Sequence, residues 1–160
     1  MGLVPTLELD DVVGGVLVSG QGPGAHGTAL ETALTLEETN LRPARSRPYV
    51  NLRCGPFAGV TESMAVVLVS AIHRPLVADR AGLPEELRSA DAATVGIGTA
   101  GFRSDCGTVL VGPDLPDGRP HRARRSGQLL AERLARHSGL DPEAPRGLTK
   151  VIQTDRGGTR

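Results

Sequence analysis

Aromatic residues are nearly absent from this chain of 160 residues. They make up 2% of it, as Tyr49, Phe57 and Phe102, and there is no tryptophan. Modules that bind single-stranded nucleic acid stack bases on aromatic side chains, so this shortage argues against that class. The 18 basic residues equal the 18 acidic residues, which also disfavours a polyanionic partner. We therefore do not expect a nucleic-acid partner, and we expect Val, Leu and Ala to build the core.

Cysteine, lysine and long hydrophobic runs are also scarce. Cys54 and Cys106 are the only cysteines, and their spacing fits neither a disulfide framework nor a zinc site. Lys150 is the only lysine, which leaves one candidate for lysine chemistry. The longest apolar run, Met64–Ala71, is too short to span a bilayer, and the first residues are acidic where a signal peptide is basic. The sequence predicts a cytoplasmic protein without a cofactor, a metal or a membrane partner.

Twenty-one glycines and twelve prolines divide the chain into short segments that alternate between strand and helix patterns. Strands are predicted at Leu3–Leu9, Val12–Ser19, Tyr49–Cys54, Ala93–Ile97, Thr108–Val111 and Leu148–Thr154. Helices are predicted at Thr28–Thr39, Ser63–His73, Pro84–Ser89 and Arg122–His137, with loops at Asn40–Pro48 and Pro113–Pro120. The first of these helices fits a strand about as well. The alternation predicts a single α/β domain over residues 1–155, a two-layer arrangement of a mixed sheet covered by helices, and a flexible tail at 156–160.

Two glycine-rich segments, 22–27 and 96–101, match the spacing GxGxxG. Neither is followed by the features of a dinucleotide site, and the lysine of a P-loop is missing, so nucleotide binding is disfavoured. Each segment is either a set of tight turns or a group of exposed amides that could hold an anion or an oxyanion.

Three titratable residues are candidates for chemistry. His26 lies inside the first glycine-rich segment, where it is either a catalytic group or the cap of a turn. Asp105 follows Thr99 and Ser104, and is either a base beside hydroxyl groups or part of an Asx turn. Glu62 is either a carboxylate in a cleft or an acid favoured at a helix start.

Charge is distributed unevenly along the chain. Residues 119–137 contain six arginines and one acid, whereas residues 1–41 contain six acids and no base. The basic helix is either a solvated face, a partner of the acidic segment within the chain or across a homodimer, or a site for an anion.

The order of these segments resembles that of the adenosylcobinamide amidohydrolases, which cleave an amide in corrinoid salvage. The resemblance runs from residue 12 to residue 136. It is carried by Val16–Gly27, Tyr49-Val-Asn-Leu, Val60-Thr-Glu62, Gly96–Asp105 before Thr108–Val111, and the helix Arg122–Arg136. The family's N-terminal region has no counterpart here. The chain also has His73-Arg74-Pro75-Leu76 and Arg124-Arg125-Ser126 where the family has lysine-containing motifs.

The resemblance implies hydrolysis of an amide in a corrinoid or another large amide substrate. Such a reaction needs a base, an acid and donors for the oxyanion. The implied catalytic residues are Asp105 or Glu62 as the base, His26 as the acid or orienting group, and the Thr99 hydroxyl. The implied substrate-binding residues are Ser19, Gly20, Gly22, Gly24, Gly27, Asn51, Gly96, Gly98 and Gly101. The alternative is a non-catalytic ligand-binding or assembly subunit that keeps the scaffold.

Overall fold

Five short segments of the described chain form the strands of one parallel sheet. The computed structural model describes residues 14–21, 23–70, 82–98, 108–111 and 121–148. The strands are β1 (Gly15–Gln21), β2 (Ala44–Pro48), β3 (Met64–Ser70), β4 (Ala93–Gly98) and β5 (Thr108–Val111). They lie in the order β2-β1-β3-β4-β5, and all four pairings are parallel. The predicted α/β class is confirmed, whereas the sheet described is parallel and not mixed.

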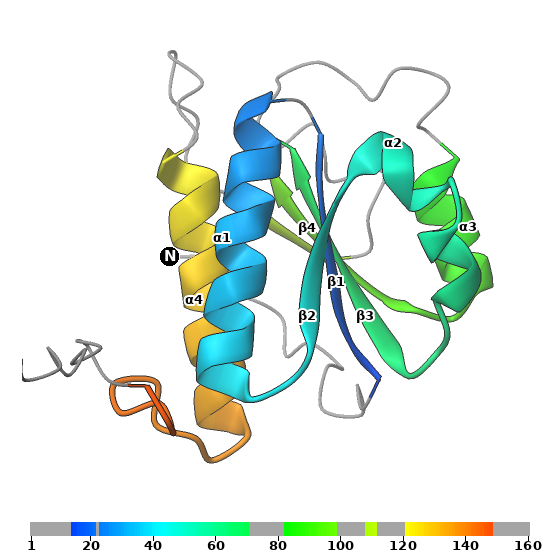
Figure 1. Cartoon of the computed structure of the whole chain (residues 1–160). Helices are drawn as coiled ribbons and strands as arrows, with labels where there is room; N and C mark the ends of the chain where they lie inside the picture. The colour runs from blue at the N-terminus through cyan, green and yellow to red at the C-terminus, as the bar shows by residue number, and fades with distance from the viewer. Residues whose placement is uncertain (1–13, 22, 71–81, 99–107, 112–120, 149–160) are drawn as a thin grey trace, which may run out of the picture.

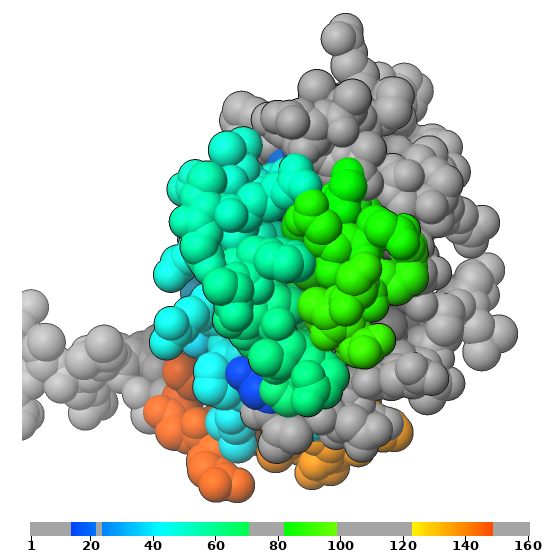
Figure 2. All heavy atoms as spheres, turned by 90° about the vertical axis from the view of Figure 1, so that its right-hand side faces the viewer, coloured from blue at the N-terminus to red at the C-terminus, as the bar shows by residue number. Residues whose placement is uncertain are grey.

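Helices lie on both faces of this sheet. Two long helices, α1 (Pro23–Asn40) and α4 (His121–His137), pack side by side on one face (Figure 1). The other face is covered by α2 (Tyr49–Leu52), the 3-10 turn η1 (Pro56–Gly59) and α3 (Leu83–Ser89), as Figure 2 shows. The arrangement therefore has three layers where the sequence predicted two, because a parallel sheet needs both faces covered by its crossover helices.

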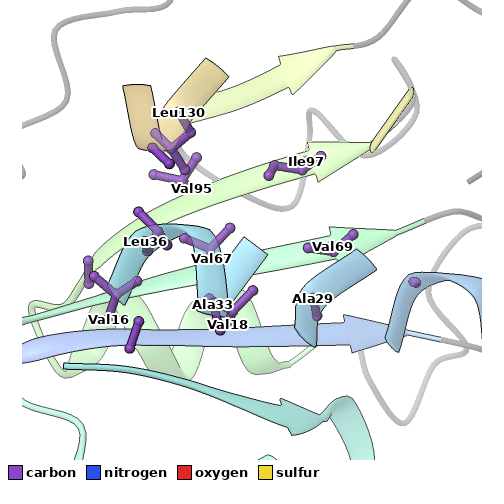
Figure 3. Close-up of a cluster of buried hydrophobic side chains, with 14 residues drawn as sticks. Val16, Val18, Ala29, Ala33, Leu36, Val67, Val69, Val95, Ile97 and Leu130 are labelled. Atoms are coloured by element: carbon purple, nitrogen blue, oxygen red, sulfur yellow. The ribbon is translucent and has the colours of Figure 1, made fainter. Parts of the chain in front are cut away.

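Alternation along the strands produces one core on each side of the sheet. Val16 and Val18 of β1 meet the alanines of α1 (Figure 3), and this core extends to Leu130 of α4. Leu17, next along β1, faces the opposite core with Leu52 of α2 and Leu87 of α3. Because β3 is buried on both faces, its sequence MAVVLVS is apolar without alternation.

Three segments differ from the sequence-based prediction. The predicted helix Ser63–His73 contains strand β3, since a short apolar run does not distinguish a buried strand from a buried helix. The predicted loop Asn40–Pro48 contains strand β2, whose polar sequence ARSRP reflects its place at an edge of the described sheet. The predicted strand Tyr49–Cys54 begins as the short helix α2.

The remaining predicted segments either agree with the structure or lie outside the described residues. The predicted helices at 28–39, 84–89 and 122–137 and the predicted strands at 93–97 and 108–111 are confirmed, and strand 12–19 is confirmed from residue 15. Gly139 has a φ of 70°, the left-handed conformation expected of a residue that ends a helix such as α4. Residues 3–9, 113–120 and 156–160 and most of 148–154 lie outside the described residues. The division into residues 1–155 and a tail stays a prediction.

Candidate functional site at the carboxyl edge of the sheet

The winding of the chain reverses between strands β1 and β3. From β1 the chain passes through α1 to β2 on one side, and from β3 it passes through α3 to β4 on the other. Crossovers between parallel strands are right-handed, so connections that leave in opposite directions place their helices on opposite faces. The carboxyl ends of β1 and β3 therefore lie at the position where open α/β sheets generally bind ligands.

Polar side chains are buried where these two strands end. Gln21 and Ser70 are paired in register as the last residues of β1 and β3, and each is 5% exposed. Ser19 lies two residues earlier on the same side of β1 and is fully buried. Its Oγ has no hydrogen-bond partner among the described residues. A buried hydroxyl that lacks a partner is costly, so an additional group that bonds to it would be stabilising.

The amino terminus of α1 lies directly over the end of β1. A Cβ placed on Gly20 would be 2.3 Å from the backbone oxygen of Ala25, so this close approach requires glycine. The 18-residue helix α1 has no acidic residue in its first turn. Its first amide groups and its dipole therefore favour an anion at this end.

His26 lies in the first turn of α1 and is partly buried. Its Nδ1 atom is buried and has no hydrogen-bond partner in the part of the chain that is described. Helix α4 also begins at this edge of the sheet (Figure 1) and likewise has no acid in its first turn. Arg124, near the start of α4, reaches α1 through a 2.8 Å ion pair with Glu31. Two helix amino termini without acidic residues make this edge attractive to anions, whereas Arg124 is already paired with Glu31.

The structure brings together only part of the site expected from the sequence. The residues that lie at or next to the carboxyl edge are Ser19, Gly20, Gly24, His26, Gly27, Asn51, Gly96 and Gly98. Glu62 lies in the turn before β3, at the opposite edge. The length of β3 separates it from this end of the sheet, about 20 Å at 3.3 Å per residue. Gly22, Thr99, Gly101 and Asp105 lie outside the described residues.

Two residues of this edge were missed in the sequence analysis. Gln21 lies two residues after the predicted strand 12–19, and a polar residue near the end of a buried strand was a usable signal. Ser70 was assigned to a helix with the rest of its segment, which hid its place at a strand end.

A pocket on the face of the sheet covered by η1 and α3 is a weaker candidate. It has a volume of about 510 Å³ and lies between η1 and α3. It is lined by Phe57, Gly82, Glu85, Glu86, Ser89 and Ala90. Its two carboxylates form ion pairs with Arg88 and Arg53. An acidic lining with its cations already engaged does not suit an anionic ligand.

The described residues contain no cluster of His, Cys, Asp or Glu that could hold a metal ion. They also contain no helix that is long and apolar enough to cross a bilayer. Cys54 is exposed and is not in a disulfide.

The comparison with known proteins rests on structure. No family model matches the sequence, and no curated protein matches it. The C-terminal domain of glucosamine-fructose-6-phosphate aminotransferase from Francisella tularensis superimposes with a TM-score of 0.70 at 22% identity, over 84% of this chain and 38% of that chain. Glucosamine-6-phosphate deaminase from Thermotoga maritima gives a TM-score of 0.70 at 21% identity, over 93% of this chain and 43% of that chain. A protein of Escherichia coli CFT073, in complex with A5P, gives 0.64 at 16% identity, over 83% of this chain and 75% of that chain.

The chain shares the fold of these solved structures, which is the SIS-domain fold. This finding overturns the resemblance to adenosylcobinamide amidohydrolases, and with it the expected corrinoid substrate and amide hydrolysis. The chain spans about two-fifths of the length of the first two proteins.

Proposed function

We propose that this SIS-domain chain binds a sugar phosphate at the carboxyl edge of its sheet. The observation that carries the proposal is the amino terminus of α1, without acidic residues, at the point between β1 and β3 where the winding reverses. The structural likeness to proteins that act on sugar phosphates supports the same ligand class. A cytoplasmic location is part of this proposal.

The two parts of such a ligand suit different parts of this edge. The phosphate group suits the first amide groups of α1, because Gly24 leaves the backbone accessible and the helix dipole favours negative charge. The sugar hydroxyls suit the side chains of Gln21 and Ser70 at the neighbouring strand ends, because amide and hydroxyl groups can both donate and accept hydrogen bonds.

A second candidate is isomerisation of the bound sugar phosphate, and one observation favours it. An aldose–ketose interconversion moves a proton between neighbouring carbons and needs a group that both accepts and donates a proton. His26 is a residue of the right type in the first turn of α1, and its buried Nδ1 is without a partner among the described residues. Binding alone does not require this proton transfer, so experiments can distinguish binding from isomerisation.

Calorimetry and thermal unfolding of the full chain test the binding proposal. We expect hexosamine and hexose 6-phosphates to bind, and the same sugars without phosphate not to bind. A ligand at a hundred times its Kd adds about 2.7 kcal/mol of stability. This gain corresponds to a rise in Tm of roughly 5–10 °C for a chain of this size. Binding of the neutral sugar as tightly as its phosphate would contradict the proposal.

A pair of variants places the ligand on the correct edge. Gln21→Glu keeps the side-chain shape and adds a negative charge beside the expected phosphate, so we expect a loss of affinity of at least roughly tenfold. Glu62→Gln makes the reverse change at the opposite edge, where we expect unchanged affinity. Equal affinity for the folded Gln21→Glu variant and the parent would place the ligand elsewhere. Isomerase activity is then measured for the parent and for His26→Gln.

A further inference from the structure

Strand β2 lies at an edge of the described sheet and has backbone groups that point away from β1. The N–H of Val16 in β1 donates a 2.8 Å hydrogen bond to the backbone oxygen of Pro43. Because the backbone groups of successive residues point in opposite directions, those of Ala44 and Ser46 point away from β1. We call the outer side of residues 44–48 the β2 edge. An edge of this kind can pair with another extended segment.

One face of the β2 edge is basic. Arg45 and Arg47 are exposed, and they pair in register with Leu17 and Ser19 of β1. Leu17 belongs to the core beneath α2 and α3, so both arginines lie on that face of the sheet. Neither arginine forms an ion pair with an acid in the described part of the chain. An acidic residue on a neighbouring strand is therefore favourable at this position.

The other face of the β2 edge lies beside exposed leucines of α1. Glu37 of α1 accepts a 3.2 Å hydrogen bond from the N–H of Ala44, so its side of the helix is next to β2 (Figure 1). Leu30 and Leu34 lie seven and three residues before Glu37, hence on the same side, and are 51% and 52% exposed. A segment that pairs with the β2 edge therefore meets leucines on one face and arginines on the other. A sequence that alternates between apolar and acidic residues suits both faces.

We propose that residues 6–9 of the same chain, Thr-Leu-Glu-Leu, add to the β2 edge as a short antiparallel strand. They lie outside the described residues, within the strand predicted from the sequence at 3–9. With Leu7 opposite Ser46, Leu7 and Leu9 face α1, and Glu8 faces the two arginines, because directly opposite residues share a face of the sheet.

This register brings together the charges and the leucines at the same time. Glu8 lies directly opposite Arg45 and diagonal to Arg47, within reach of both guanidinium groups. Leu7 and Leu9 are about 7 Å apart along a strand, and the two exposed leucines of α1 are about 6 Å apart along their helix. Helix α1 begins over the end of β1 and ends beside the start of β2, so it runs in the direction of the added strand. Each leucine of the added strand therefore meets one leucine of α1.

The length of the chain permits this path. Gly14 directly precedes β1. Leu9, opposite Ala44, lies about 12 Å from Gly14, since it is two strand spacings across the sheet and two residues along it. The five residue steps between these positions can span about 17 Å. The connection therefore fits with slack.

The added strand stops before the candidate site. Pro5 faces Pro48 at its far end, and neither proline has an N–H to donate, so the pairing ends there. The amino terminus of α1, where we propose that a phosphate binds, stays uncovered. Because a strand of four residues opens locally, β2 remains less protected from hydrogen exchange than β3.

Disulfide trapping in the full chain tests the position and the register. Both native cysteines are replaced by serine, and Leu7→Cys/Ser46→Cys is expected to form a disulfide within one chain. Directly opposite residues of a hydrogen-bonded pair have Cα atoms about 5.5 Å apart, which suits a disulfide. Thr6→Cys/Ser46→Cys is the matched control, because position 6 is one residue away but on the opposite face. We expect its disulfide to form at least roughly tenfold more slowly.

Two outcomes of this trapping experiment would overturn the proposal. A segment without a fixed register would join both cysteine pairs at the same rate. A disulfide between two chains, seen as a doubled mass on a denaturing gel, would assign the β2 edge to another copy. Circular dichroism shows whether the variants are folded, and unfolding of the Ser46→Cys variants moves the test to charge reversal.

Charge reversal is measured by hydrogen exchange on a chain that keeps its native cysteines. Glu8→Arg is expected to accelerate exchange of the β2 amides roughly fivefold, because repulsion replaces attraction across the edge. Arg45→Glu in the same chain is expected to reverse this acceleration. Asp11→Arg changes an acid beyond the added strand, so it is expected to leave β2 unchanged. Equal effects of Glu8→Arg and Asp11→Arg, or no rescue by Arg45→Glu, would refute the added strand.

Discussion

Gly20 lies where strand β1 leaves no space for a side chain. A Cβ at this position would meet backbone atoms of α1, with the oxygen of Ala25 at 2.3 Å and the Cα of His26 at 2.7 Å. Backbone atoms cannot move aside as the end of a flexible side chain can. Gly20→Ala is therefore expected to lower the free energy of unfolding by about 3 kcal/mol or more, the upper range for overpacking. Urea unfolding measures the loss.

Gly27 is the matched control for this substitution. It lies in the same turn region of α1, but a Cβ there would meet no atom within 4 Å. Gly27→Ala is expected to stabilise the chain by up to about 1 kcal/mol, because alanine has the higher helix propensity. If the two variants were equally stable, the close packing of α1 on the end of β1 would be refuted.

The residues of the candidate site were predictable in part. The sequence analysis found His26 and the glycines before it, because glycines next to a strand end suggest a close approach of backbone and ligand. It also grouped Glu62 with them, although the structure places that residue at the opposite edge. No local pattern reports which edge of a sheet a loop occupies, because this depends on strand direction and order across the whole chain.

At the scale of elements, the pairing of α1 with α4 depends on another glycine. A Cβ on Gly127 of α4 would be 2.3 Å from Thr32 Oγ1 and 3.1 Å from its Cγ2. Thr32 is buried and its hydroxyl donates to the backbone oxygen of Thr28 at 2.8 Å. Gly127→Ala must therefore separate the helices or displace the threonine, and we expect a loss of about 1–3 kcal/mol.

A double-mutant cycle with Thr32→Ala checks this explanation by urea unfolding. Thr32→Ala removes the atoms that the new methyl group would meet, so Gly127→Ala is expected to cost less in that background than in the parent. The interaction between the two changes should exceed roughly 0.5 kcal/mol in the favourable direction. Additive effects would show that the two residues do not limit the approach of the helices.

The position of each strand in the sheet explains which elements were wrongly predicted from the sequence. Segment 64–70 is apolar because both faces of β3 are buried, so its sequence lacks the alternation that identifies a strand. Segment 44–48 is polar because β2 lies at an edge of the described sheet, where Ala44 is the only residue of ARSRP that is buried. Helix α4 was predictable, because its apolar residues recur on one side of a long segment, whereas the threonine-rich segment of α1 fitted a strand about as well.

For the whole molecule, the succession of strands and helices was sufficient to predict an α/β fold. It was not sufficient to predict that the sheet is parallel, has helices on both faces and reverses its winding between β1 and β3. These properties follow from the order of the strands in space, which arises from contacts between distant segments. The candidate site depends on that order, and therefore became visible only in the structure.

The order of the strands also predicts how stability is distributed. Strand β3 is paired on both sides, with β1 and β4, and residues 65–70 are all buried. Strand β2 pairs with β1 and has exposed arginines at positions 45 and 47. Amides of β3 should therefore exchange with solvent only through global unfolding, whereas amides of β2 can exchange through local opening, which costs less free energy.

Hydrogen exchange followed by mass spectrometry measures this difference. At low protein concentration, peptides from β3 should exchange at least roughly a hundredfold more slowly than peptides from β2. Low concentrations of urea should accelerate exchange in β3 strongly, because global unfolding exposes a large surface, and should change exchange in β2 little. If β2 exchanged as slowly as β3 and responded equally to urea, the sheet would open as one unit, and the edge position of β2 would not determine its stability.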